Sequence, residues 1–228
     1  MKRQLILLAA WLSALTVQAN PIIVDNGSPD YGNAYYSDLS PGIGGGIQAA
    51  SSFVVGAANT LTDIHWWGGY GISSFSHAVD HFTIYLYNDS GGSPGTVAYT
   101  IPVGAPARID TGVNLFVSLD IFSYQFDLLA PIVLPTGTTY WLSILNDTAG
   151  DPGGEWVWAT SNQLAGDDQS RLLHSGSPGP WGSLHVELAY QLTGLTSSSV
   201  PDAGGTLPLL GAALFGFGLL RWRTARDA

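Results

Sequence analysis

The chain has 228 residues, with 29 glycines, 13 prolines, no cysteine and a formal net charge of −10. The absence of cysteine excludes disulfides, zinc–thiolate sites and a cysteine nucleophile. Between residues 20 and 199 only Arg108 and Arg171 are basic against 15 acidic residues, a net charge near −13 that argues against nucleic acid as a partner. The many Trp, Tyr and Phe residues indicate a packed core rather than a disordered chain.

The N-terminus predicts export. Lys2 and Arg3 form a short basic region, and residues 5–17 form an apolar stretch of 13 residues that is too short to span a bilayer comfortably. Val17 and Ala19 stand at the −3 and −1 positions of a signal-peptidase site. We therefore expect residues 1–19 to be a signal peptide that is cleaved after Ala19.

Residues 20–199 are expected to form one domain, because 180 residues suffice for one sizeable core. Apolar and polar side chains alternate with period two, for example over 82–87 and 185–192, and no sustained helical periodicity is found. Turn-forming clusters at 88–95 and 146–154 separate successive strands. The pattern predicts an all-β fold, an antiparallel and jelly-roll-like β-sandwich. The expected strands are 22–24, 47–55, 61–67, 79–88, 96–101, 113–119, 124–129, 138–145, 155–161, 171–174 and 184–192.

Acidic loops offer a candidate calcium site. Asp147, Asp151 and Glu155 flank a glycine-rich loop, whose carboxylate and carbonyl oxygens are the hard ligands that Ca²⁺ takes. Asp167 and Asp168 form a second acidic cluster. Neither matches the twelve-residue EF-hand loop, and the alternative for both is a solvated acidic turn. The sequence requires no cofactor and leaves calcium open.

Tryptophans offer a candidate surface for sugars. Trp156 and Trp158 have the same parity on a predicted strand and would lie on one face, where they could stack on sugar rings. The alternative is core packing, because sandwiches also bury Trp. The adjacent Trp66 and Trp67 must face opposite ways, so at least one of them is expected inside.

Patterns typical of enzymes are weak in this chain. His77 and His81 could share a strand face, but the alternation that follows does not support a helical metal-binding pair. Ser, His and Asp occur without a local arrangement that ties them together, and Glu155 and Glu187 are the only glutamates, so neither a catalytic triad nor a carboxylate pair is indicated. We expect a protein that is not an enzyme, with a secreted hydrolase as the least favoured alternative.

The C-terminal segment consists of a short motif, an uncharged apolar run over 203–220 and a basic cluster. The 18 uncharged residues are about the minimum for a transmembrane helix. The arginines that follow are expected to stay in the cytoplasm, which places the preceding domain on the far side of the membrane. The motif is Val200, Pro201, Asp202, Ala203 and Gly204, and the basic cluster is Arg221, Arg223 and Arg226.

This tail resembles the PEP-CTERM sorting domains of Gram-negative bacteria, in particular the VPDSG variety, with Ala203 where that pattern has Ser. The resemblance covers residues 200–228 and implies cleavage near the motif by an exosortase, a multi-pass membrane protease or transpeptidase. The alternative is a tail retained as a single-pass anchor. The segments 82–95, 140–144 and 156–158 are similar to β-sandwich ectodomains that often precede such tails, a likeness that implies no catalytic residues.

These patterns predict a signal peptide (1–19), a β-sandwich ectodomain (20–199) and a sorting domain (200–228). We expect the protein to be exported, to sit transiently in the inner membrane through its tail, and to reach the cell surface or the extracellular matrix. Its expected role is structural or adhesive, in association with exopolysaccharide, for instance in a biofilm. A lectin-like carbohydrate-binding module is the first alternative.

Overall fold

The computed structural model describes residues 20–39, 45–71, 80–115, 119–148, 154–163, 166–174 and 177–196. Within these ranges the chain forms no helix, and hence none that is long and apolar enough to cross a membrane. The predicted signal peptide, the sorting motif and the basic cluster lie outside the described residues, as do Asp151 and His77. The described residues confirm the all-β expectation.

The first of two sheets has seven strands and is built around β4 (Ala58–Tyr70). β14 (Tyr190–Thr196) and β10 (Trp156–Ser161) pair in succession with one edge of β4, and β8 (Leu119–Val133) pairs with the other. The remaining strands each extend one of these partners. They are β1 (Ile22–Asp25) beside β14, β2 (Pro29–Tyr36) beside β10, and β7 (Arg108–Leu115) beside β8.

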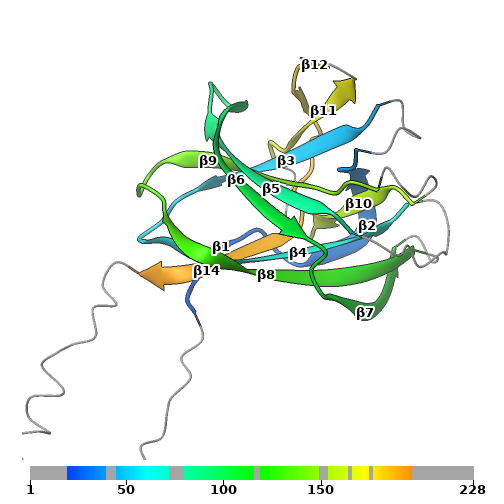
Figure 1. Ribbon diagram of the computed structural model, residues 1–228, viewed down its shortest axis with the longest axis horizontal. Helices are drawn as coiled ribbons and strands as arrows, with labels where there is room; N and C mark the ends of the chain where they lie inside the picture. The colour runs from blue at the N-terminus through cyan, green and yellow to red at the C-terminus, as the bar shows by residue number, and fades with distance from the viewer. Residues whose placement is uncertain are drawn as a thin grey trace, which may run out of the picture.

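The second sheet also has seven strands, in the order β12-β11-β3-β9-β5-β6 with β13 beside β11, and its described pairings are antiparallel like those of the first. The two sheets lie one over the other, with β3, β5, β6 and β9 in one layer and β1, β4, β8 and β14 in the other (Figure 1). The strands of this sheet are β3 (Ile47–Val54), β5 (Phe82–Asp89), β6 (Pro94–Gly104), β9 (Thr139–Leu145), β11 (Gln169–His174), β12 (Ser177–Pro178) and β13 (Gly182–Ser183).

The core lies between the sheets, where period-two alternation turns one face of each strand inward. Phe82 of β5 makes edge-to-face contacts with three rings of the opposite sheet, at centroid distances of 5.4 Å to Trp66, 5.1 Å to Tyr124 and 5.0 Å to Trp156. The alternation predicted over 82–87 is confirmed, because Phe82, Ile84 and Leu86 are buried in this core. Aromatic packing between the layers therefore replaces the disulfides that the chain lacks.

The neighbouring strand β10 explains why a glycine, Gly68, follows Trp66 and Trp67 on β4. A Cβ on Gly68 would stand 2.4 Å from the indole of Trp156, so the absence of a side chain makes room for that ring. The prediction that Trp66 and Trp67 face opposite ways is confirmed, since Trp66 is fully buried and Trp67 is partly exposed on the outer face.

Several strand boundaries were predicted wrongly. No strand was expected at β2, whose Asp, Gly and Asn residues have low strand propensity, but pairing with β10 holds it in the sheet. The strand expected at 113–119 is two strands, because β7 ends at Leu115 and β8 starts at Leu119. The strand expected at 184–192 starts only at Tyr190, and before it Leu188 makes an isolated bridge to Thr160. The hairpin expected at 88–95 is confirmed between β5 and β6.

Candidate functional site

The two tryptophans proposed for glycan contact lie in the core. Trp156 and Trp158 are 0% exposed, and their rings stand 6.4 Å apart on the inner face of β10. The indole N–H of Trp158 donates to the carbonyl of Ala189 over 2.8 Å. A buried ring cannot stack on a sugar, so the prediction of glycan contact is wrong and the core-packing alternative holds. The prediction that the two side chains lie on the same face of their strand is confirmed, but that face is the inner one.

The first acidic group proposed for calcium is only partly described. Glu155 is buried, with its Oε2 atom lacking a hydrogen-bond partner, whereas the side chain of Asp147 is exposed. Asp151 lies outside the described residues, so this calcium site stays a prediction.

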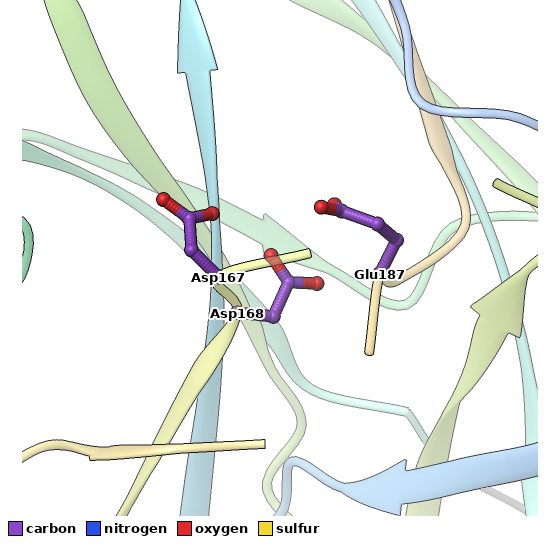
Figure 2. Close-up of side chains that lie close together, drawn as sticks. All are labelled: Asp167, Asp168 and Glu187. Carbon is purple, nitrogen blue, oxygen red and sulfur yellow. The ribbon is translucent and has the colours of Figure 1, made fainter. Parts of the chain in front are cut away.

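A different acidic cluster gathers in the described part of the chain, formed by Asp167, Asp168 and Glu187. One potential ligand atom from each lies within 4.8 Å of the others. Asp167 and Asp168 come directly before β11 of the second sheet, and Glu187 lies on the segment that leads into β14 of the first (Figure 2). The second acidic pair of the sequence is thus joined by a glutamate 19 or 20 residues further along the chain. The pairing of β13 with β11, and hydrogen bonds from the N–H groups of Leu184 and Leu188 to Asp168, bring the two segments together.

Each member of this acidic cluster is held differently. Asp167 is exposed and accepts a hydrogen bond of 2.8 Å from the hydroxyl of Ser52. Glu187 is partly buried and accepts one of 2.9 Å from the amide of Asn26. Asp168 is 0% exposed: its Oδ2 accepts from the backbone N–H of Leu188 over 2.6 Å, and its Oδ1 has no hydrogen-bond partner.

Burial and like charge act together on these acids. Burial raises the pKa of Asp168 well above its ordinary value, and the neighbouring carboxylate of Glu187 raises it further. Burial also raises the pKa of Glu187, although the hydrogen bond from Asn26 opposes the change. The cluster therefore favours a proton or a cation beside its carboxylates, at a place where water cannot fully solvate their charge.

The two arginines of the domain are engaged elsewhere. Arg108 lies over the ring of Phe122, with its guanidinium carbon 5.1 Å from the centroid. Arg171 lies 4.4 Å from the centroid of Trp181 and donates two hydrogen bonds to the amide oxygen of Gln48, at 2.9 and 2.7 Å. Among the described residues no basic side chain makes an ion pair with the acidic cluster.

A groove crosses the outer face of the first sheet. Its volume is about 330 Å³, and it is bounded by β4 on one side and by β8 and the start of β7 on the other. The outward side chains of β4 and β8 alternate with the buried ones, so the groove collects polar atoms around one indole. The lining residues are His65, Trp67, Ala107, Ile109, Ser123, Tyr124, Gln125 and Asp127.

A polar network fixes the side chains at one end of this groove. The Nε2 atom of His65 lies 2.5 Å from Oδ1 of the buried Asp63, and the amide of Gln125 donates to Oδ2 of Asp63 over 2.9 Å. Burial by itself raises the pKa of Asp63, but hydrogen bonds with His65, Asp127 and Gln125 outweigh it and lower the pKa to about 2. The hydrogen bond with Asp63 raises the pKa of Asp127. Asp63 thus stays ionised at neutral pH and orients the groove's imidazole and amide.

Sequence reasoning did not single out the groove. His65 and Trp67 have the parity opposite to the buried Trp66, which was a usable signal that they share an outer face. The position of Gln125 opposite His65 in the β4–β8 ladder depends on register, which the sequence did not reveal.

Comparison with known proteins gives a family and no function. No curated protein and no solved structure is detectably similar to the chain. One family matches residues 32–193, a range that includes both the acidic cluster and the groove. Because the match covers more than half of the sequence, the chain belongs to the family described as a domain of unknown function (DUF7901).

Proposed function

We propose that this chain is an exported, non-catalytic β-sandwich domain of the cell surface or extracellular matrix that binds a neutral polysaccharide in the groove between β4, β7 and β8. The observation that carries the proposal is the composition of that groove, in which the indole of Trp67 stands beside the hydrogen-bonding side chains of His65, Ser123, Gln125 and Asp127. An aromatic face with a few convergent polar groups is the combination that recognises a sugar ring and its hydroxyls.

The charge of the domain selects among glycans. Residues 20–199 carry 15 acidic and two basic side chains, and Asp127 lies in the groove itself. The resulting negative electrostatic potential repels acidic polysaccharides and does not oppose the binding of neutral ones. The partner is therefore a neutral exopolysaccharide, and the role is adhesive or structural.

The route to the surface belongs to the proposal as well. A signal peptide cleaved after Ala19 would export the domain, and the tail from Val200 onward would hold it in the inner membrane until an exosortase cuts near the motif. The jelly-roll-like form of the sandwich, as expected from the sequence, is part of the same proposal. Intact mass of the protein from membrane and extracellular fractions of its host tests the route: a released species without Arg221, Arg223 and Arg226 is expected, and a species that keeps them and stays in the membrane would make the tail an anchor.

Binding is tested by isothermal titration of the full-length protein with neutral polysaccharides such as dextran, starch and mannan. Trp67→Ala should weaken binding of the preferred glycan at least tenfold, which corresponds to about 1.4 kcal/mol. Tyr99→Ala is the matched control, because Tyr99 is an exposed aromatic residue on β6 of the other sheet and should leave affinity unchanged. Equal affinity of both variants would refute the groove as the binding site, and turnover of the glycan would make the protein a hydrolase.

A further inference from the structure

The geometry of the cluster of Asp167, Asp168 and Glu187 matches the needs of one cation. Two oxygens bound to the same Ca²⁺ at 2.3–2.6 Å are at most about 5 Å apart. The ligand atoms of the three carboxylates lie within 4.8 Å of one another, which is close to the spacing that a single ion bound by all three requires. Figure 2 shows the three carboxylates gathered at the point where the segments leading into β11 and β14 approach each other.

The second observation is an unpartnered oxygen on the most deeply buried member of this cluster. Asp168 is fully buried, and its Oδ1 atom accepts no hydrogen bond. Native proteins rarely leave a buried carboxylate oxygen without a partner unless a ligand or a proton stands at that place. The other Asp168 oxygen is already held by the backbone of Leu188, so the side chain is fixed with its free oxygen in the cluster.

The donor set decides the kind of ion. All three side chains supply hard, anionic oxygens, which suit Ca²⁺ and Mg²⁺, whereas zinc sites use nitrogen and sulfur. Three carboxylates provide up to six oxygens in an irregular arrangement, which suits the flexible coordination of Ca²⁺ better than the octahedron that Mg²⁺ requires. No described basic side chain competes for them through an ion pair.

We propose that Asp167, Asp168 and Glu187 bind one calcium ion that joins the start of β11 in the second sheet to the segment before β14 in the first. The backbone already links these segments, because the N–H groups of Leu184 and Leu188 donate to Asp168 over 2.7 and 2.6 Å. The ion adds a second link between the two layers and removes the repulsion between the carboxylates. This site is separate from the polysaccharide groove, and its test does not depend on glycan binding.

The full-length protein, freed of metal with EDTA, is titrated with calcium chloride at neutral pH by calorimetry and by thermal unfolding. One calcium per chain is expected, with a dissociation constant on the order of 10⁻⁴–10⁻³ M, the range of extracellular calcium modules. At a calcium concentration about 100 times that constant, Tm should rise by roughly 5–10 °C. Magnesium at the same concentration should raise Tm less, and an equal or larger rise would overturn the assignment to calcium.

Two variants locate the ion. Asp168→Asn and Glu187→Gln keep the side-chain shape but remove an anionic ligand, so each should lose the Tm rise and weaken calcium binding at least tenfold. Asp110→Asn is the matched control, because it removes the same charge from an exposed position on β7, where the carboxylate accepts a hydrogen bond of 2.8 Å from the backbone N–H of Gly112. If the wild-type protein binds no calcium saturably, or if both cluster variants bind it as the wild type does, the proposal is wrong.

Discussion

Replacing Trp158 by alanine should destabilise the fold strongly while leaving the groove between β4, β7 and β8 intact. Trp158 is fully buried, and its ring packs 6.4 Å from Trp156 and 6.1 Å from Tyr190. Truncation of a buried Trp to Ala costs about 3–5 kcal/mol, and the loss includes the hydrogen bond from its indole to the carbonyl of Ala189. For a domain of this size each kcal/mol lowers Tm by about 2–4 °C, so we expect a fall of roughly 6–20 °C.

The assay compares Trp158→Ala with Trp67→Ala by thermal unfolding, followed by near-UV circular dichroism, and by glycan titration well below both melting temperatures. Trp67 is only partly buried against Leu119 and Ile121, so its loss should cost about 1–2 kcal/mol and lower Tm by a few degrees. The two variants should therefore show opposite profiles. Trp158→Ala loses stability and keeps affinity, whereas Trp67→Ala loses affinity and keeps most of its stability.

The reasoning is refuted if Trp158→Ala unfolds within a few degrees of the wild type. Such a result would mean that the ring is not packed between the sheets. Loss of glycan affinity in the folded Trp158→Ala protein, with affinity retained in Trp67→Ala, would point the same way.

Two further predictions concern the acidic cluster and the groove. A Cβ on Gly166 would stand 1.3 Å from Oε1 of Glu187, so Gly166→Ala should displace this flexible carboxylate, weaken calcium binding several-fold and change the calcium-free Tm little. Gly56→Ala is the control, because a Cβ there meets nothing within 4 Å and calcium binding should be normal. Equal calcium affinities of the two variants would contradict the site. The pKa of Asp63 is lowered from 3.8 to about 2 in the folded state, so ionised Asp63 contributes stability above its unfolded pKa, and this contribution should be lost as the pH falls from about 4 to about 2. Urea unfolding across that pH range should show a smaller decrease for Asp63→Asn, which cannot titrate beside His65, and an identical decrease would contradict the assignment.

The alternation of apolar and polar residues and the turn clusters predict much of the fold. Phe82, Ile84 and Leu86 alternate with polar or amphipathic residues. Successive side chains of a strand point to opposite faces, so this alternation places the three apolar side chains on one face. The turn cluster at 88–95 contains the glycines that take positive φ at Gly91 and Gly92, so the hairpin was readable as well. The strand β2 was not readable, because its polar residues become a strand only through pairing with β10.

The candidate sites depended on contacts between distant segments. Asp167 and Asp168 are an acidic pair in the sequence, but Glu187 joins them only because β13 pairs with β11 and the segment that follows β13 hydrogen-bonds to Asp168. In the same way, Gln125 reaches Asp63 because the register of β4 and β8 places them in neighbouring positions. Neither of these contacts can be predicted from the pattern of residues along the chain.

The sequence by itself determined the strand-rich architecture, the acidic charge of the domain, the absence of disulfides and the parity of each side chain on its strand, because these follow from composition and from the period of an extended backbone. The tertiary structure decided which face of each strand is inner and which residues from different strands meet. Parity divides Trp66 from Trp67 and joins Trp156 to Trp158, but only the packing of one sheet on the other shows that Trp67 is the ring that stays partly exposed. Burial is a property of the whole assembly of strands, and it is what separates a core residue from a binding residue of the same type.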